Sequence, residues 1–274
     1  MSERTAIVLG ASADIGAAHV RRLAADGWSV LGTYRSPGGA ADLEDLEGVT
    51  LVRCDVASPA DIAALAARAS EQEPWTLVIS AVGRLDPVGP WAELDFDAWE
   101  RSVRDNSTAQ LRAVHALLPF RRRDGAHVAF FAGGGTNGPF RNYSAYCVAK
   151  VLLIKMCELL HDEVVDLNAF IVGPGFLPTK IHAPTLADPR AAGDNHAKTL
   201  NFYARPDDAL SVDDVHDCVL WAVQQGRDVV GGRNIAAAHD PWGETNGRTA
   251  RLLKDAPDAW RLRRVPLPSE PYDP

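Results

Sequence analysis

The sequence has little of what marks a secreted, metal-binding or membrane-spanning protein. No apolar run approaches the roughly 20 residues of a membrane-spanning helix, and the first residues do not resemble a signal peptide. The few cysteines form no C-x-x-C pair and have no histidine at metal-ligand spacing, which favours reduced thiols over disulfides or a metal site. We therefore expect a cytoplasmic protein with no membrane and no metal partner. The four cysteines are Cys54, Cys147, Cys157 and Cys218.

Positive charge is also scarce, because the formal net charge of the 274 residues is −8 and the one basic run is Arg121–Arg123. Surfaces that bind nucleic acid usually carry a basic patch, so we expect no nucleic-acid partner. Hydrophobic residues make up 46% of the chain, which suffices for one large core. A single α/β domain of this length is routine.

Short apolar runs alternate with longer stretches of helical spacing along most of the chain. Strands that are buried on both faces of a parallel sheet read as apolar runs without in–out alternation. Helices between such runs cover the two faces of the sheet. The sequence therefore predicts an α/β fold with one doubly wound, Rossmann-type parallel sheet of about seven strands. The expected strands are residues 5–10, 29–34, 49–54, 75–81, 127–132, 168–173 and 233–238.

Two regions fall outside this alternation. Residues 174–206 hold several prolines and no sustained period, which predicts an irregular lid or binding loop. Residues 241–274 are rich in Pro, Trp and Arg. We expect a core domain at 1–240 that includes the loop 174–206, followed by a C-terminal tail extension at 241–274. The expected helices cover about 11–26, a stretch from Pro59 capped by Ser58, 97–122 with Asp95 or Asp97 near its start, 143–162, and 212–225 capped by Ser211.

A glycine-rich turn, GASADIG at 10–16, follows the first expected strand and opens an Ala-rich helix. Glycine allows a tight turn and a close approach of the backbone to a pyrophosphate, and the helix N-terminus attracts the anion. The position of this turn in the chain indicates a dinucleotide site. Asp14 stands at the middle glycine position, and we expect it to cap the helix with its side chain turned away from the phosphates.

The second expected strand ends at Thr33-Tyr34-Arg35 without the acidic residue that holds the ribose 2′-hydroxyl of NAD. Arg35 can pair with a 2′-phosphate instead, through its charge and its planar donor fork. The alternative is an ordinary exposed loop arginine. The missing acid favours NADP(H) over NAD(H).

Tyr146 and Lys150, in YCVAK at 146–150, are four residues apart on an expected helix and project from the same face. A nearby ammonium lowers the pKa of a phenol, which makes the tyrosine a usable general acid or base. Such a pair is common on amphipathic helices, but its place after the fifth strand of a dinucleotide fold favours catalysis.

Taken together, these motifs resemble the short-chain dehydrogenase/reductase family over about residues 4–240. GASADIG is similar to the family's TGxxxGIG turn, residues 80–83 to its NNAG motif, YCVAK to YxxxK, and Pro174-Gly175 with Thr179 to PGxxxT. The resemblance implies that Asn106 supports a water-linked proton relay and that Asp55 contacts adenine. Tyr146, Lys150 and Asn106 are the catalytic residues implied. The cofactor-binding residues implied are Gly10, Ser12, Ile15, Gly16, Arg35, Asp55, Val56, Ala81, Gly83, Lys150, Pro174, Gly175, Leu177 and Thr179.

The chain departs from the family where a catalytic serine is expected, about 13 residues before the tyrosine. Ala132 and Gly133 stand there and have no hydroxyl, while Ser144 lies on another helix face. Thr136 and Asn137 are candidate substitutes.

The leading hypothesis is hydride transfer between NADP(H) and a small-molecule carbonyl or alcohol, with Tyr146 as general acid or base. Two alternatives stay open: non-redox acid–base chemistry such as dehydration, cyclisation or epimerisation, and a cofactor-binding regulatory protein without turnover. By analogy with the family we expect a homotetramer or homodimer formed through the helices at 97–122 and 143–162.

Overall fold

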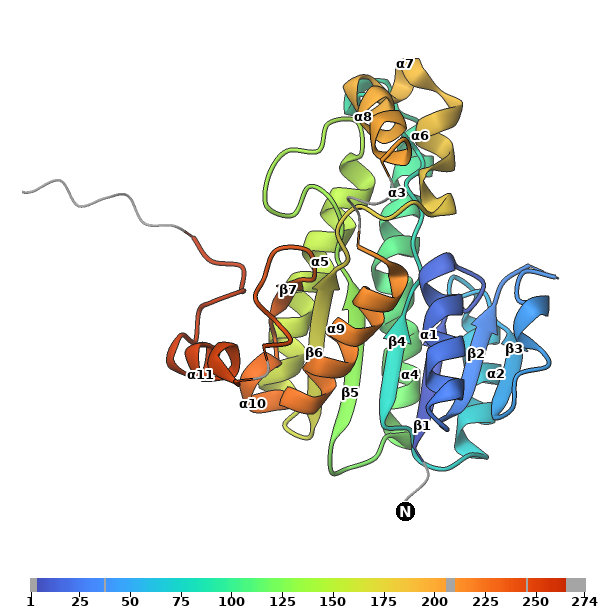
Figure 1. The fold of residues 1–274 in the computed structure, drawn as a ribbon. Coiled ribbons are helices and arrows are strands. Elements are labelled where there is room, and N and C mark those ends of the chain that lie inside the picture. The colour runs from blue at the N-terminus through green and yellow to red at the C-terminus, as the bar shows by residue number, and fades with distance from the viewer. Residues whose placement is uncertain (1–3, 37, 206–209, 245, 265–274) are drawn as a thin grey trace, which may run out of the picture.

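Seven parallel strands form one sheet, as the apolar runs predict, and their order in the structure is β3-β2-β1-β4-β5-β6-β7 (Figure 1). The computed structural model describes residues 4–36, 38–205, 210–244 and 246–264. Apart from the partly exposed β3 and the short β7, the strands are almost wholly buried because helices cover both faces of the sheet. The strands are β1 (Thr5–Leu9), β2 (Ser29–Tyr34), β3 (Val49–Arg53), β4 (Leu77–Ser80), β5 (Ala126–Phe131), β6 (Leu167–Gly173) and β7 (Asn234–Ala236).

The helices form two layers with a hydrophobic core under each. On one face, α1 (Asp14–Ala25) and α9 (Val212–Gln225) pack side by side. On the other face lie α2 (Pro59–Ser70), α4 (Thr108–Leu117) and α5 (Ser144–Glu163). The expected caps are present, since the Ser58 hydroxyl accepts a hydrogen bond from the Asp61 amide at 3.2 Å and Ser211 forms a capping box with Asp214. Shorter elements are η1 (Ala41–Leu43), η2 (Trp91–Glu93), α10 (Arg227–Val230) and α11 (Arg248–Asp255).

The single helix expected over 97–122 is wrong, because the structure has two helices and a final 3-10 turn. Asp95 caps α3 (Phe96–Asn106), accepting from the Ala98 amide at 2.7 Å. Ser107 then leaves the helical region, at φ −139° and ψ −83°, before α4 and η3 (Leu118–Phe120) continue the chain. The break brings the end of α3 to the edge of the sheet where the strands end.

The irregular conformation expected at 174–206 is also wrong for residues 174–205, which are largely helical; Pro206 lies outside the described residues. The segment forms η4 (Lys180–His182), α6 (Ala183–Ala187), α7 (Pro189–Ala192) and α8 (Asp194–Tyr203) above the carboxyl ends of the strands (Figure 1). The prolines begin helices here instead of breaking them: Pro184 and Pro189 each lie in a first helical turn, where a proline amide is not needed. Asp188 caps α7 through the Ala191 amide at 2.9 Å.

The segment after β7 folds back onto the core within residues 237–244 and 246–264; residues 245 and 265–274 of the expected tail lie outside the described part. The Asn234 amide donates to the Trp260 carbonyl at 2.7 Å, and the Ala236 amide donates to the Asp240 carboxylate at 2.6 Å. Arg233, only 3% exposed, donates to backbone carbonyls of this segment, among them Leu253 at 2.7 Å. The described part of the expected tail therefore packs against β7 and α10.

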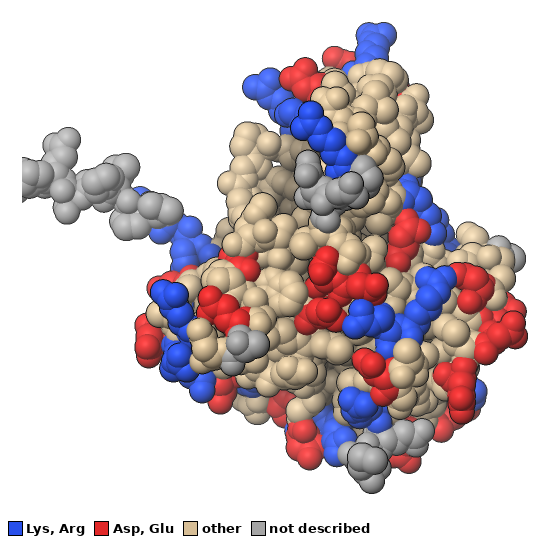
Figure 2. All heavy atoms as spheres, viewed as in Figure 1, with Lys and Arg blue, Asp and Glu red and all other residues tan. Residues whose placement is uncertain are grey.

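No described helix is long and apolar enough to cross a membrane. Acidic and basic side chains lie side by side on the face shown in Figure 2.

Two buried histidines join α1 to α9. The Nδ1 atoms of His19 and His216 lie 2.7 Å apart, both side chains are fully buried, and the His19 ring stacks on Phe131. One ring must donate and the other accept, so the contact needs at least one neutral ring. Burial lowers the pKa of both histidines, and Arg22 lowers both further.

We expect these histidines to make the fold sensitive to acid. Their pKa values lie below 6.5 in the folded chain, so the unfolded chain takes up protons first as the pH falls below 6.5, and stability is lost there. Replacing both with leucine should flatten the fall in melting temperature between pH 7 and pH 5. Calorimetry at several pH values measures this, with the exposed His115→Gln as a control. An unchanged slope in the double variant contradicts the assignment.

Candidate active site

The glycine turn adopts the conformation that its sequence predicts. Gly10 has a φ of +80°, its amide donates to the Thr33 hydroxyl at 3.0 Å, and the Ala11 amide donates to the Thr33 carbonyl at 2.7 Å. A Cβ atom on Gly16 would overlap the Gly10 carbonyl oxygen, so only glycine fits there. The turn joins β1 to the first turn of α1, and its backbone can approach a ligand closely.

Asp14 does not cap α1, so that expectation is wrong. The N-cap is Ala13, without a side-chain hydrogen bond, and Asp14 is the first helical residue. Its carboxylate accepts from the Lys180 amide at 2.6 Å. The aspartate therefore ties the phosphate turn to the loop that follows β6.

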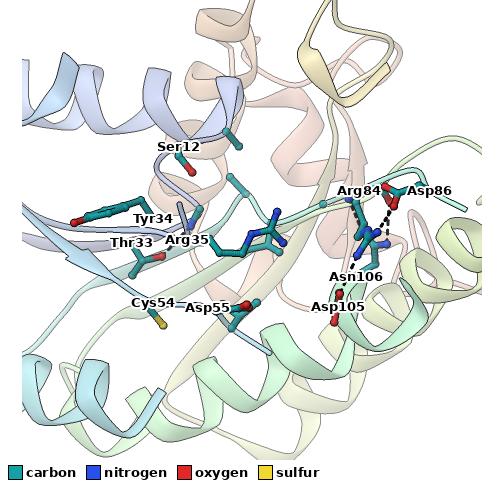
Figure 3. Close-up of a pocket in the computed structure, with 16 residues that line it drawn as sticks. Ser12, Thr33, Tyr34, Arg35, Cys54, Asp55, Arg84, Asp86, Asp105 and Asn106 are labelled. Carbon is teal, nitrogen blue, oxygen red and sulfur yellow. Dashed lines mark hydrogen bonds and ion pairs between the residues drawn. The ribbon is translucent and has the colours of Figure 1, made fainter. Parts of the chain in front are cut away.

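A cavity of about 400 Å³ begins at this turn and runs along the ends of β2, β3 and β4. The Arg35 side chain points into it from the end of β2 (Figure 3). Thr33 and Asp55 line the cavity from neighbouring strand ends. The expected residues that it brings together are Gly10, Ser12, Arg35, Asp55, Val56, Ala81, Gly83 and Asn106.

A second cavity, of about 690 Å³, adjoins the first and shares Gly83 and Arg84 with it. It contains both members of the tyrosine–lysine pair and the glycine-rich loop after β5, and Phe140 and Phe176 contribute apolar walls. The expected residues along it are Ile15, Ala81, Gly83, Tyr146, Lys150, Pro174, Gly175, Leu177 and Thr179, together with the candidate substitutes Thr136 and Asn137.

Tyr146 and Lys150 lie on one face of α5, as their spacing predicts, and both are almost fully buried. The Lys150 ammonium nitrogen is 5.4 Å from the centre of the Tyr146 ring. Burial lowers the pKa of Lys150 to about 8. The expected lowering of the tyrosine pKa is wrong for this arrangement, because burial, with a smaller contribution from Cys147, raises the pKa of Tyr146. The phenol therefore holds its proton at neutral pH.

Gly133, one of the two positions where the resemblance expects a serine, lies against the Tyr146 hydroxyl. A Cβ atom on Gly133 would overlap that hydroxyl and the ring edge next to it, so the tyrosine occupies the space that a side chain at 133 would need. Ser144 is engaged elsewhere, since it accepts a hydrogen bond from the Trp99 indole at 3.0 Å. The Thr136 hydroxyl donates to the Gly133 carbonyl at 3.3 Å.

Asn106 positions the backbone next to the pair. Its side-chain oxygen accepts from the Arg84 amide at 2.9 Å, and its side-chain nitrogen donates to the Arg84 and Ser102 carbonyls, each at 3.0 Å. The Asn106 side-chain oxygen and the Lys150 ammonium lie 3.8 and 3.9 Å from the point where a Cβ of Gly83 would sit. Asn106 thus fixes the wall beside Lys150, and its side-chain amide is already engaged by protein groups.

An aromatic group covers the second cavity from the segment after β6. The His182 ring stacks on Phe176 with centres 4.2 Å apart, and Phe202 and Tyr203 of α8 pack against them. Burial lowers the pKa of His182, so this ring is held in its neutral form. The arrangement makes a largely apolar wall facing the cavity.

Comparison with known proteins assigns the chain to one family. Residues 4–190 match the short chain dehydrogenase family. The chain belongs to the short-chain dehydrogenases. Serine 3-dehydrogenase of Agrobacterium fabrum is 23% identical over 82% of this chain and 90% of that protein. Cis-4-hydroxycyclohexanecarboxylate dehydrogenase of Sinomonas cyclohexanicum is 32% identical over 69% of this chain and 80% of that protein.

Solved structures of short-chain dehydrogenases share the fold. Actinorhodin polyketide ketoreductase, solved with NADPH, superposes with a TM-score of 0.76 at 21% identity, covering 87% of this chain and 98% of that one. A short chain dehydrogenase/reductase from Saccharomyces cerevisiae gives 0.79 at 20% identity over 87% and 97% of the two chains. The chain is therefore an oxidoreductase of a family that acts on small molecules and uses NAD(P)(H).

Two cationic residues of this short-chain dehydrogenase line the site and were not identified by the sequence motifs. Arg84 lines both cavities, and its guanidinium pairs with Asp86 and, at 3.3 Å, with Asp105 (Figure 3). Lys180 lines the second cavity and pairs with Asp14. Each directly follows a predicted cofactor residue, Gly83 or Thr179, and that adjacency is the signal that could have identified them.

Proposed function

We propose that this chain is an NADP(H)-dependent oxidoreductase that transfers a hydride to or from a small-molecule carbonyl or alcohol, with Tyr146 as general acid or base. The observation that carries the proposal is a buried tyrosine beside a buried lysine, in a cavity that adjoins a glycine turn of dinucleotide-binding form. The glycine turn fits a nicotinamide dinucleotide, because Gly10 has a positive φ and a side chain on Gly16 would overlap the Gly10 carbonyl, so the backbone of the turn can approach a pyrophosphate closely. When bound, that cofactor supplies or accepts the hydride.

Tyr146 and Lys150 supply the proton that the reduction of a carbonyl requires. In reduction, the Tyr146 hydroxyl donates its proton to the oxygen of the carbonyl as negative charge develops there. The Lys150 ammonium stabilises the phenolate that remains, since an opposite charge nearby favours the ionised form. The raised pKa of Tyr146 keeps the donor protonated at neutral pH and suits the reductive direction.

Neither Ala132 nor Gly133 offers the substrate oxygen a serine hydroxyl, so we propose that other side chains donate to it. Thr136 and Asn137 line the same cavity and are the side chains that we propose for this role. The apolar wall around Phe140 and Phe176 favours a substrate with a sizeable apolar or aromatic part.

The function is tested by following NADPH oxidation across a panel of aliphatic, cyclic and aromatic ketones. We expect turnover of at least one bulky apolar ketone by the wild-type protein and its loss in Tyr146→Phe. Tight NADPH binding with no turnover of any carbonyl in either direction would point to a regulatory protein instead. A product formed without net change in NADPH would point to non-redox chemistry.

Arg35 should set the preference for NADP(H). Its guanidinium points into the nucleotide cavity and is exposed enough to meet a 2′-phosphate, and charge-assisted bidentate contacts of this kind are strong. We expect Arg35→Ala to raise the Kd for NADPH by about 10- to 100-fold while changing the Kd for NADH less than about threefold.

Titration by cofactor fluorescence measures both constants. Arg112→Ala, which removes an exposed arginine of α4 far along the chain from the turn, is the matched control. Equal weakening of NADPH and NADH in Arg35→Ala would contradict a 2′-phosphate contact.

A further inference from the structure

A segment that we call the strap, residues 177–182, crosses the groove between the phosphate turn and the catalytic pair. Leu177 is buried in the core at one end, and the Thr179 carbonyl accepts a hydrogen bond from the Tyr203 hydroxyl at 2.8 Å. At the other end, Ile181 packs against the hydrophobic cluster of Leu85, Tyr143 and Tyr146. The strap is therefore fixed at both ends, and Lys180 between them faces the glycine turn.

Lys180 contacts the glycine turn in three ways. Its amide donates to the Asp14 carboxylate at 2.6 Å, and its ammonium lies 3.5 Å from the other oxygen of the same carboxylate. The ammonium also donates to the Ser12 carbonyl. Ser12 and Asp14 belong to the turn whose shape admits only glycine at positions 10 and 16, so the cation lies on the rim of the expected phosphate site.

Asp14 poses an electrostatic problem that Lys180 resolves. A carboxylate in the first turn of α1 suits the helix dipole, but it repels a pyrophosphate that approaches the same turn. Because the ammonium neutralises Asp14 and is still about two-thirds exposed, with a side-chain exposure of 65% against 37% for Asp14, it can turn towards an incoming anion.

We propose that Lys180 is a pyrophosphate-binding residue of the cofactor site, and that Asp14 is the counter-ion that holds it on the turn until the dinucleotide binds. This inference rests on the proposed dinucleotide function and extends it to the strap. On binding, the ammonium leaves the Asp14 carboxylate for a phosphate oxygen, while the Lys180 amide keeps its bond to Asp14 and holds the strap across the groove. If Lys180 only anchored the strap to the turn, its ammonium would stay on Asp14 both with and without the bound dinucleotide.

The two roles are separated by a double-mutant cycle on the full-length protein. The Kd for NADPH is measured for wild type, Lys180→Met, Asp14→Asn and the double variant, with Lys180→Arg as the conservative variant and the exposed Lys198→Met of α8 as the matched control. We expect Lys180→Met to weaken NADPH binding about tenfold, which is about 1.4 kcal/mol. Lys180→Arg should stay within about threefold of wild type, and Lys198→Met should not change the Kd.

The coupling between Lys180→Met and Asp14→Asn tests whether Asp14 is the counter-ion of Lys180. In wild type, binding must break the pairing of the ammonium with Asp14, so Lys180→Met should weaken binding more when Asp14→Asn is already present than when it is made in the wild-type chain. Asp14→Asn alone should tighten NADPH binding by a few-fold. An equal effect of Lys180→Met with and without Asp14→Asn would show that the ammonium does not leave Asp14 and would overturn the switch.

Cofactor fragments locate the contact. 2′-Phospho-ADP-ribose, which contains the pyrophosphate, should lose affinity in Lys180→Met, whereas adenosine 2′-monophosphate, which lacks it, should not. Equal binding of NADPH by wild type and Lys180→Met would overturn the inference while leaving the proposed function intact. Failure of wild type to bind NADPH at all would instead refute the proposed function.

Discussion

Tyr146→Phe should reduce the kcat of NADPH-dependent carbonyl reduction by about 10²- to 10⁴-fold, the usual contribution of a positioned general acid. The change removes one oxygen from a buried ring and leaves the packing against Gly133 and Leu85 in place. The KM for the ketone and the Kd for NADPH should therefore change little. Single-turnover kinetics, which separate binding from the chemical step, are the decisive measurement.

Tyr143→Phe is the matched control, because it removes a second tyrosine hydroxyl from the start of the same helix. That hydroxyl lies 2.8 Å from the Thr185 hydroxyl and takes no part in the pair with Lys150. Tyr143→Phe should retain kcat and lose some stability through the broken hydrogen bond. Similar losses of kcat in the two variants would remove Tyr146 from the mechanism.

The Tyr146–Lys150 pair should also make kcat/KM for reduction fall at high pH. The pKa of Lys150 is about 8 in the folded protein, below its usual value of 10.5. As the pH rises through about 8, the free enzyme loses the ammonium that stabilises the phenolate, so kcat/KM for reduction should fall. The stability contribution has the opposite sign: between pH 8 and 10.5 the unfolded chain binds more protons at this residue, and stability rises with pH.

Gly133→Ser should impair catalysis, although it places a serine at one of the two positions where the family resemblance expects one. The new Cβ atom would overlap the Tyr146 hydroxyl, so either the tyrosine or the loop after β5 must move. Forcing atoms into a packed site typically costs about 1–3 kcal/mol. We expect a lower melting temperature and at least a roughly tenfold loss of kcat, because small misplacements of a reacting group are costly.

Gly138→Ser tests whether the effect comes from position and not from loss of glycine in the loop. A Cβ atom at 138 meets nothing within 4 Å, and this glycine has no positive φ. Gly138→Ser should therefore keep the melting temperature of the wild type. A Gly133→Ser variant with increased kcat would show instead that the site lacks only a hydroxyl and that the tyrosine can move aside without loss.

The elements that could be predicted from sequence are those whose signals are local. Continuous apolar runs identified all seven strands, and Ser58 and Ser211 gave helix starts because their hydrogen-bond partners are only three residues away. Tyr146 and Lys150 share a helix face by spacing alone. The same local logic failed at Pro184 and Pro189, because a proline that breaks one helix also suits the start of the next.

The rest depended on contacts between distant segments. Asp14 looked like a cap, but its partner Lys180 is 166 residues away, and no spacing rule could connect the two. The tyrosine pKa was expected to fall, because a charged neighbour can be read from sequence and the burial that outweighs it cannot. The overlap between a side chain at 133 and Tyr146 likewise depends on the path of the loop after β5.

The backbone at β7 gives the sheet a closed end. The outward amides of Asn234 and Ala236 already donate to Trp260 and Asp240, which come later in the same chain. An additional strand from another molecule could pair there only after displacing the Trp260 carbonyl and the Asp240 carboxylate. Trp260 and Asp240 thus protect the β7 edge of the sheet from edge-to-edge aggregation.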